Sequence, residues 1–432
     1  MTNSTNSQSS ISRRQFLKVG AATGAALAST QFGRGPIIWA QNIKDVELRF
    51  IGTGVSQVNE VAAKVQEDLG FKLNMRPLST DENIQIALTQ PKQFDIYDGE
   101  YFSLPQVVPS GNLQPIDTSR IKNFDKIVPI FTTGKLYDGA PVNSSQGTSP
   151  IKVMYLEAQD SKAFASSPTD WATMIPFQYN ADTLGYRPDL VGRKIESWAE
   201  LFNAEFKGKT SILDIPSIGI MDAAMVVEAS GLMTFGDKGN MTREELDKIT
   251  EILIEQKQAG QFRAFWKTFT ESVELMASGE VVLQSMWSPA VTQVKARGIE
   301  CVYAPLKEGY RAWGGGVGLS RNLSGLELDA AYEYMNWMLD GWLGAFLGRQ
   351  GYYSAAPELS KQYMSADEWD FWYEGKPAAT DMVDPFGNTL EKTGTVRDGG
   401  NFNDRMGNVV VWNSTMEEQA YLVKKWNEFV AA

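Results

Sequence analysis

The chain has 432 residues, 43% hydrophobic and 21% charged, enough for a buried core and roughly two to three domain-sized units. Its 40 Lys and Arg against 52 Asp and Glu give a formal net charge of −12, which argues against nucleic acid or an anionic membrane surface as partner. The sequence has no histidine and one cysteine, Cys301, so it excludes His-based nucleophilic triads, His-ligated zinc, an imidazole base and an internal disulfide.

Residues Ser12–Lys18 read S-R-R-x-F-L-K, which resembles the twin-arginine export signal at every specified position. The weakly apolar stretch Val19–Thr30 is too short and too rich in Ala and Gly to anchor in a bilayer. Ala40 offers a small residue for cleavage, and no cysteine directly follows it to carry a lipid anchor. We therefore expect residues 1–40 to be a signal peptide, and a periplasmic mature chain with a formal charge of −16 instead of −12.

The first predicted unit is a strand, a glycine turn and a helix. Val46–Phe50 alternates apolar and polar residues as a strand does, and Gly52–Gly54 turns the chain. We expect Ser56 to cap a helix over residues 58–69. A helix start offers free N–H groups to the polar end of a ligand, so Thr53 is a candidate binding residue. The turn lacks the third glycine of a dinucleotide fingerprint.

A strand over Lys72–Leu78, a helix over Asp81–Leu88 and a strand over Phe94–Tyr97 follow. The last strand ends in two carboxylates and two aromatic rings: Asp98, Glu100, Tyr101 and Phe102. Such a cluster is either a solvated loop or, at the carboxyl end of a strand, part of a binding site. The polar, Gly- and Ser-rich segment 138–170 is predicted to be a surface insertion, and its sequence indicates no function.

Strands and helices continue to alternate in the second half, which predicts largely parallel sheets. We expect strands over Pro176–Tyr186 and Lys209–Asp214, a helix over Met221–Ser230, and capping boxes that open helices at Ser197 with Glu200 and at Thr242 with Glu245. A single long helix is predicted over Leu326–Gly351, opened by Ser324 with Glu327. Further helices are predicted over Lys361–Asp370 and Ser414–Phe429.

Two tryptophans follow apolar runs that read as buried strands. Trp287 comes after Val281–Met286, and Trp313 follows Ile299–Tyr303 at a distance and precedes three glycines. Both stand in a turn-like setting, which favours the wall of a ligand cleft, although tryptophans more often fill a core.

Six segments resemble the spermidine/putrescine-binding group among the solute-binding proteins of bacterial ABC importers. They read FDIYDGEYF, PFQYNADTLGYRPD, SWAELFNAEFKGKTSILD, FRAFWKTFTESVELMASGEVVLQSMW, YRAWGGGVGLSRN and GYYSAAPELSK. The resemblance implies an α/β fold of the two-lobed periplasmic binding protein type (type II), each lobe a mostly parallel sheet flanked by helices, with the ligand cleft between lobes. By this likeness, residues 41–177 plus 311–347 form the first lobe and residues 178–310 plus 348–432 the second.

In that group aromatic rings enclose the methylene chain and carboxylates pair with the ammonium ends. The resemblance carries the ring positions to Trp287, Trp313, Tyr179, Tyr101 and Phe102. The acids carry over less well, because Gly315 stands where the group has an aspartate and only Asp214 remains of an acidic pair.

Either Asp98, Glu100 and Asp182 replace the missing acids, or the ligand is not a simple polyamine, since an unpaired buried ammonium is costly. Arg405, with Asn403 beside it, would favour a carboxylate-bearing amine if it lines the cleft, but a surface arginine is an equal alternative.

These observations predict a non-enzymatic, monomeric binding protein that delivers a small amine-containing solute, polyamine-like or amino-acid/opine-like, to an inner-membrane permease. No cofactor or metal is expected. One alternative is a ferric-ion carrier of the same fold, because Tyr352-Tyr353 resembles the adjacent tyrosines of such carriers. Another is an exported hydrolase that uses a carboxylate pair, such as Asp98 with Glu100 or Asp367 with Glu368.

Overall fold

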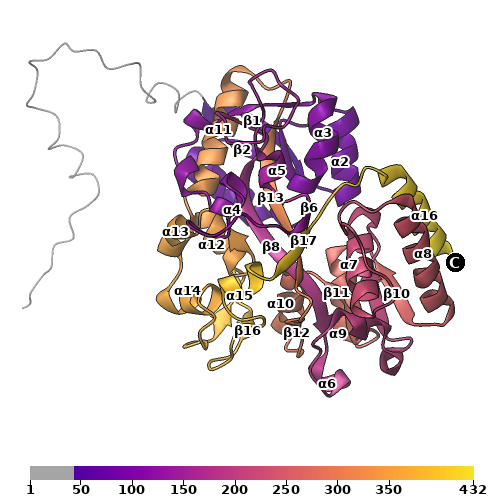
Figure 1. Ribbon diagram of the computed structural model, residues 1–432. Coiled ribbons are helices and arrows are strands. Elements are labelled where there is room, and N and C mark those ends of the chain that lie inside the picture. The colour runs from indigo at the N-terminus through magenta and orange to yellow at the C-terminus, as the bar shows by residue number, and fades with distance from the viewer. Residues whose placement is uncertain (1–42) are drawn as a thin grey trace, which may run out of the picture. The chain divides into compact units, whose positions relative to one another are not determined.

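The computed structural model describes residues 43–432, which Figure 1 colours from indigo to yellow along the chain. The predicted signal peptide lies outside this part of the chain. Among residues 43–432, no helix has the length and apolar composition needed to cross a bilayer.

One mixed sheet organises these residues. Its main path runs in the order β10, β9, β11, β8, β13, β3, β1, β2. The strands are β1 (Glu47–Gly52), β2 (Lys72–Pro77), β3 (Ile96–Glu100), β8 (Ile175–Tyr186), β9 (Thr210–Leu213), β10 (Phe262–Trp266), β11 (Leu283–Met286) and β13 (Tyr310–Ser320). Short strands pair beside this path: β4 (Leu113–Gln114), β6 (Gln146–Gly147), β12 (Val302–Tyr303), β14 (Tyr353–Ser354) and β17 (Val409–Trp412). Two small sheets join β5 (Ile116–Asp117) to β7 (Trp171–Ala172) and β15 (Met382–Val383) to β16 (Thr389–Glu391).

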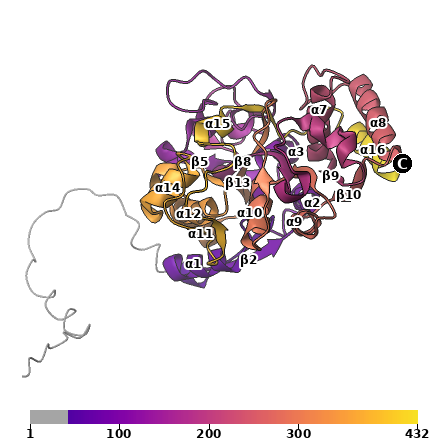
Figure 2. The ribbon, with the colours of Figure 1, turned by 90° about the horizontal axis from the view of Figure 1, so that it is seen from below.

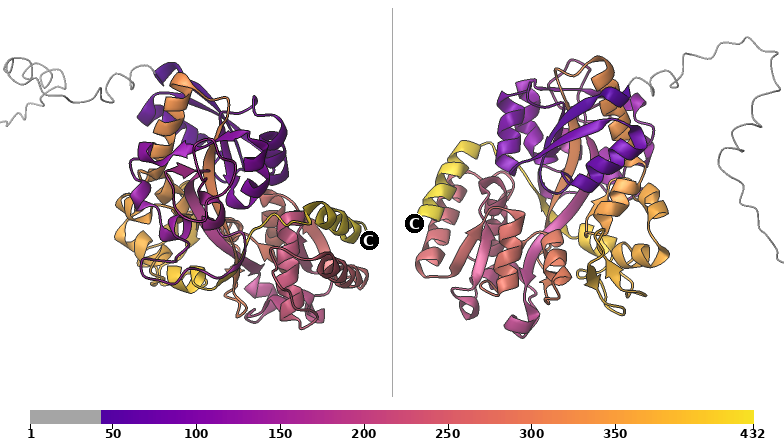
Figure 3. Two further views of the ribbon diagram at one scale, coloured as in Figure 1. Left: turned by 45° about the horizontal axis from the view of Figure 1, so that its top comes forward. Right: turned by 180° about the vertical axis from the view of Figure 1, so that it is seen from behind.

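Two groups of three parallel strands stand at opposite ends of the path, β3-β1-β2 and β10-β9-β11. The long strands β8 and β13 join the groups and run antiparallel to each other and to their outer neighbours (Figure 3). The predicted parallel pairing is therefore correct within each group and wrong for the two joining strands. Every residue of β8 and β13 is buried, including polar and charged ones such as Asp182 and Arg311.

Helices cover both groups. Around β1–β3 lie α1 (Asn59–Leu69), α2 (Thr80–Thr89), α3 (Leu104–Ser110) and α11 (Gly325–Leu339). Around β9–β11 lie α7 (Pro216–Ala229), α8 (Arg243–Gln258), α9 (Phe269–Ser278), α10 (Ser288–Ala296) and α16 (Gln419–Ala431), and Figure 2 shows α7, α8 and α16 together. The shorter helices are α4 (Pro129–Thr132), α5 (Ile151–Met154), α6 (Pro188–Val191), α12 (Trp342–Gly348), α13 (Pro357–Ser360), α14 (Ala366–Trp372) and α15 (Phe402–Met406).

α8 forms as its sequence predicts. Thr242 and Glu245 make both hydrogen bonds of a capping box at its start. Leu246, Ile249 and Leu253 recur on one face and are buried against the core that includes Trp426 of α16. Local capping and the 3.6-residue period agree here, so the sequence alone specifies the helix.

The interval predicted as one long helix, Leu326–Gly351, contains two. α11 ends at Leu339, and Gly341 separates it from α12 with a φ of 109°, which only glycine adopts readily. A Cβ at Gly341 would collide with the backbone oxygen of Leu359. The prediction was wrong because apolar residues continue through the break, so their spacing does not reveal it.

Two predicted caps, at Ser56 and Ser324, and the predicted capping box of Ser197 are also wrong. Ser56 does not cap α1, which begins after Val58; its hydroxyl instead donates to the Asp98 carboxylate. Ser197 caps only a 3₁₀ helix, Trp198–Phe202, while the Glu200 carboxylate that should complete a box pairs with Arg193. Ser324 makes no side-chain cap to α11.

Trp313 lies in the middle of β13 and not in a turn, which corrects the sequence prediction. The glycines after it serve close packing: a Cβ on Gly314 would lie 2.8 Å from the Phe131 ring, and one on Gly316 would lie 2.9 Å from the Ile175 backbone oxygen. Segment 138–170 is not wholly on the surface either, since Val153–Leu156 are buried in the core and β6 pairs with β17.

Candidate functional site

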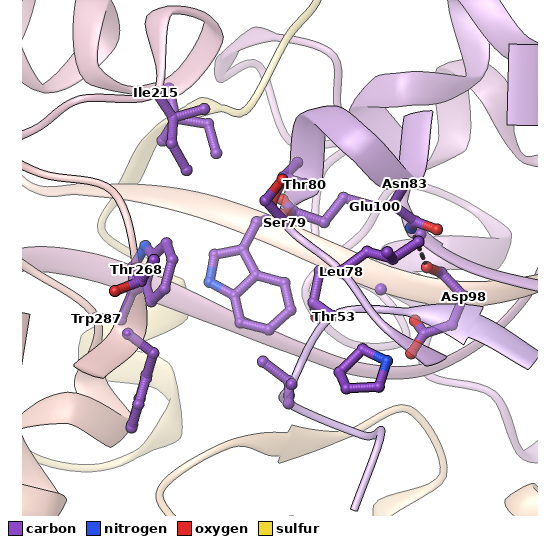
Figure 4. Close-up of a pocket in the computed structure, with 18 of the residues that line it drawn as sticks. Thr53, Leu78, Ser79, Thr80, Asn83, Asp98, Glu100, Ile215, Thr268 and Trp287 are labelled. Carbon is purple, nitrogen blue, oxygen red and sulfur yellow. Dashed lines mark hydrogen bonds between the residues drawn. The ribbon is translucent and has the colours of Figure 1, made fainter. Parts of the chain in front are cut away.

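A cavity of about 580 Å³ lies where the six parallel strands end, a size typical of small-molecule sites. Each of these strands supplies a lining residue at or just beyond its carboxyl end, where ligands of α/β sheets bind. From the β1–β3 group these are Thr53, Leu78, Ser79, Asp98 and Glu100, and from the β9–β11 group Ile215, Lys267, Thr268 and Trp287. Figure 4 shows Trp287 and Thr268 on one side of the cavity and Asp98 and Thr53 on the other.

Four helices begin at this cavity, because each follows one of the parallel strands. Ser79 and Thr268 close capping boxes at the starts of α2 and α9. Ile215 and Trp287 precede α7 and α10, each of which has a proline in its first turn. The cavity wall therefore presents helix N-termini as well as side chains.

Aromatic rings form much of the wall. Trp287 packs edge to face on Trp266, with ring centroids 4.9 Å apart, and stacks on Phe269 at 6.4 Å. Trp313 meets Tyr352 edge to face at 5.9 Å. All of these rings except Trp266 line the cavity, as does Phe102. Trp287 and Trp313 thus face one shared space, and neither is enclosed in a separate core.

Two carboxylates stand on one face of β3, because side chains two positions apart in a strand point the same way. Asp98 accepts the Ser56 hydroxyl, and Glu100 accepts Nδ2 of Asn413 at 2.9 Å. Among the described residues, no Lys or Arg nitrogen lies within 4.0 Å of either carboxylate. Burial raises the pKa of Asp98 and of Glu100 to about 7, because low-dielectric surroundings disfavour their charged forms.

The close fit around Asp98 depends on a glycine at the end of β1. A Cβ on Gly52 would lie 2.8 Å from the Asp98 carboxylate and 2.9 Å from Nε2 of Gln57. Asn83, from α2, donates Nδ2 to the backbone oxygen of Asp98 at 2.6 Å, the dashed line of Figure 4. Asp98 is therefore held by its backbone and its side chain at the cavity edge.

Two of the predicted tyrosines do not line this cavity. Tyr101 is buried, and its hydroxyl donates to the Met174 backbone oxygen at 3.0 Å. Tyr179 is buried among rings, with Phe131 at 5.5 Å and Tyr353 at 5.7 Å between centroids.

Three predicted charged residues also have partners elsewhere. Asp182 pairs with Arg311 at 3.4 Å, and Asp214 accepts Trp426 Nε1 at 2.7 Å and pairs with Lys267 at 3.2 Å. Arg405 is 1% exposed and lies over the Tyr303 ring at 4.4 Å. Of the predicted ligand-binding residues, the cavity brings together Thr53, Asp98, Glu100, Trp287 and Trp313.

Several lining residues were not singled out from the sequence: Ser79, Asn83, Gln178, Lys267, Thr268, Gln293 and Asn413. The boxes Ser79–Glu82 and Thr268–Glu271 were available as signals, because a helix start directly after a parallel strand belongs to the ligand edge of the sheet. Asn413 follows a short strand far along the chain, and no local pattern marks it.

The chemical character of the cavity is aromatic and acceptor-rich. Lys267 is the one basic side chain among the described lining residues, and it is paired with Asp214. Residues 43–432 contain no cluster of three or more Cys, Asp or Glu side chains that could hold a metal ion. The arrangement suits a cation with an apolar body.

The family model described as bacterial extracellular solute-binding protein matches residues 60–370, and the twin-arginine translocation pathway signal sequence matches residues 10–30. A search of curated proteins gave no match. Because the signal and the extracellular family occur together, the chain is exported by the twin-arginine route to the periplasm.

Three solved structures illustrate the fold. The spermidine/putrescine ABC transporter substrate-binding protein PotD from Streptococcus pneumoniae is 14% identical with a TM-score of 0.58, over 89% of this chain and 98% of that one. MotA from A. tumefaciens B6, in complex with glucopine, is 14% identical with a TM-score of 0.58, over 89% and 99%. AgtB from A. tumefaciens R10, in complex with agropinic acid, is 13% identical with a TM-score of 0.52, over 73% and 85%. These likenesses confirm the two-lobed periplasmic binding protein fold.

Proposed function

The chain belongs to the family of bacterial extracellular solute-binding proteins, and we propose that its cavity binds a small amine-containing solute, polyamine-like or amino-acid/opine-like. The protein is the periplasmic solute-binding component of an ABC importer, which binds a small solute and works with a membrane permease. The acidic and aromatic lining of the cavity supports an amine as the solute.

One observation carries the proposal: a single cavity contains two carboxylates that have no cationic partner among the described residues, and it also contains several aromatic rings. A protonated amine would supply the missing positive charge to Asp98 and Glu100. The faces of Trp287 and Trp313 would add roughly 0.5–2 kcal/mol each by contact with the cation or its alkyl chain. The sequence had left the replacement of the family's acids open, and this geometry supports Asp98 and Glu100 in that role.

The names and bound ligands of the solved structures with this fold suggest the solute class proposed here. PotD carries spermidine/putrescine in its name, and MotA and AgtB were solved with glucopine and agropinic acid. At 13–14% identity these structures support the same fold but not the same ligand. Which amine binds therefore depends on the residues that line this cavity.

Closure is part of the proposal. We take residues 41–177 plus 311–347 as one lobe and residues 178–310 plus 348–432 as the other, with β8 and β13 among the strands that join them. The solute would be enclosed by both lobes, and the closed form of a monomer would be the one that the permease recognises.

The ferric-ion carrier and a hydrolase that uses Asp367 with Glu368 gain no support from the described residues. Tyr352 lines the cavity, but Tyr353 is buried and its hydroxyl accepts Nη1 of Arg397 at 2.9 Å, so the adjacent phenols do not face one ion site. Glu368 belongs to a capping box and pairs with Arg349, which leaves no free pair with Asp367 for hydrolysis.

Isothermal titration with matched amines and alcohols tests the proposal. 1,4-Diaminobutane and 4-aminobutanoate are compared with 1,4-butanediol, which keeps the length but carries no charge. We expect at least one amine to bind and to change tryptophan fluorescence, and the diol to do neither. If the diol binds as tightly as the amines, or if no amine in a broader panel binds, the proposal is wrong.

A further inference from the structure

A buried ion-pair network joins the two long strands beside the cavity. Arg311 on β13 lies opposite Asp182 on β8 in the strand register, and its Nη2 lies 3.4 Å from Oδ2 of Asp182. Nε of Arg311 donates to Oδ1 of Asp222, on α7, at 2.6 Å. All three side chains are at most 2% exposed. Two elements therefore hold the guanidinium in one orientation.

The remaining arm of this guanidinium reaches the residue after β17. Nη1 of Arg311 donates to Oδ1 of Asn413 at 2.7 Å. Because a guanidinium has only donors, the amide atom that faces Arg311 must be the oxygen. The amide nitrogen then faces the other way, where Nδ2 of Asn413 donates to Oε2 of Glu100 at 2.9 Å. Arg311 thus decides which atom of Asn413 meets Glu100.

Glu100 is the point where this network reaches the cavity. Glu100 and Asn413 both line it, whereas Arg311, Asp182 and Asp222 are not among its lining residues. A carboxylate has about four lone-pair sites, and the Asn413 amide uses one of them. The carboxylate therefore keeps acceptor capacity for an N–H group in the cavity while its position is fixed from behind.

We propose that Arg311 and Asn413 are positioning residues, which hold the Glu100 carboxylate in place as a cation acceptor of the cavity. Arg311 orients the Asn413 amide, and that amide fixes Glu100 and favours its ionised form. This assignment rests on the proposed binding of an amine, since Glu100 is the member of this network that would touch the solute's charge.

The groups that face Glu100 set the direction of the expected effect. Burial raises the pKa of Glu100 to about 7, donation by Asn413 and the charge of Arg311 lower it, and the charges of Asp182 on β8 and Asp98 on its own strand raise it. Asn413→Asp keeps the shape and the acceptor for Arg311, but replaces the donor to Glu100 by a carboxylate. The pKa of Glu100 should then rise.

The first test follows Glu100 itself in the ligand-free protein. Glutamate labelled with ¹³C at Cδ is titrated by NMR, and Glu100→Gln assigns the resonance. We expect a midpoint of about 7 in the wild type, and a rise of about one pH unit or more in Asn413→Asp. Arg311→Lys keeps the positive charge but loses the planar guanidinium with its several donors, so it should raise the Glu100 midpoint less than Asn413→Asp does. Asn408→Asp makes the same chemical change at an exposed position outside the cavity, and it should leave the Glu100 midpoint unchanged.

The second test measures affinity for 1,4-diaminobutane near neutral pH. Asn413→Leu removes the donor without adding charge, and binding should weaken about tenfold, as one unit of pKa implies. An unchanged Glu100 midpoint in folded Asn413→Asp, or an unchanged affinity in folded Asn413→Leu, would overturn the assignment. If the wild type binds no amine at all, the proposed function fails, while the NMR titration still decides whether Arg311 and Asn413 position Glu100.

Discussion

Asp98 is only 4% exposed, and its carboxylate meets a serine hydroxyl where a buried acid would ordinarily have a cation. Glu100 likewise accepts a neutral donor, the Asn413 amide, and burial raises the pKa of both acids to about 7. Acids in such surroundings cost stability, because burial disfavours their charged forms. A cationic solute removes that cost, so affinity and ionisation are linked at the level of single residues.

The stability of the ligand-free protein should therefore fall as pH rises from about 5 to about 8. A carboxyl whose pKa is higher in the folded than in the unfolded state binds extra protons in the folded state between the two values, so deprotonation in that window destabilises the fold. Asp98→Asn should remove part of this loss, on the order of 2 kcal/mol at pH 8. Urea unfolding of the wild type and of Asp98→Asn at about pH 5 and about pH 8 measures this change in the free energy of unfolding. Equal pH dependence in the two proteins would contradict the assignment of the effect to Asp98.

The tryptophans should contribute to affinity individually. Trp287→Leu and Trp313→Leu should each weaken amine binding by roughly tenfold, because each removes one ring face from the cavity wall. Trp171→Leu, at a half-buried position outside the cavity, is the matched control and should bind normally. Calorimetric titration of the three variants provides the comparison. Normal affinity in both cavity variants would mean that the rings are only packing residues.

At the residue scale, the sequence predicts where along a strand a site residue stands better than which way it points. Tyr179 was predicted to line the cleft, but in β8 it is the preceding residue, Gln178, that lines the cavity. Successive strand residues point to opposite faces, so an error of one position reverses the result. Asp98 and Glu100 were predicted as a cluster of acids and aromatic rings at the end of a strand, and both line the cavity.

At the scale of elements, the sequence pattern located the strands well. β9 lies inside its predicted interval, and β8 begins at Ile175, directly before its predicted start. Boundaries that depend on tertiary contacts were missed. Ser56 could have capped a helix, but the buried Asp98 carboxylate takes its hydroxyl instead. The break at Gly341 is set by the approach of the Leu359 backbone, which lies outside any local window.

Gly341→Ala should therefore destabilise the protein by about 2–4 kcal/mol, because it combines a left-handed φ with a backbone collision. Gly192→Ala is the matched control: its φ of +74° is also left-handed, but a Cβ there meets nothing within 4 Å. It should cost about 1 kcal/mol. Urea unfolding of both variants separates crowding from backbone strain. Similar losses in the two would show that the collision is relieved by a small shift.

At the scale of the whole molecule, export and fold were both predicted from sequence, for different reasons. The twin-arginine segment is a short local pattern, so its residues suffice. The two-lobed fold depends on β8 pairing with β13 across more than a hundred residues, and periodicity alone cannot specify such pairing. Its prediction came from the order and spacing of six segments that resemble a known group, and the solved structures confirm it.

The export signal makes a prediction at this scale. Replacement of Arg13 and Arg14 together by lysine keeps the charge but removes the guanidinium pair of the signal. The variant should stay in the cytoplasm as an uncleaved precursor, whereas the wild type should reach the periplasm in a shorter form. Cell fractionation with mass measurement of both fractions gives the result. A normal periplasmic yield of the lysine variant would contradict twin-arginine export.

The most direct test of the central claim is native mass spectrometry of protein freshly released from the periplasm, followed by identification of any solute it carries. The account predicts a small solute with at least one protonated amine, lost in a variant with Asp98→Asn and Glu100→Gln together. A retained sugar, a metal ion or a nitrogen-free acid in the wild type would contradict it.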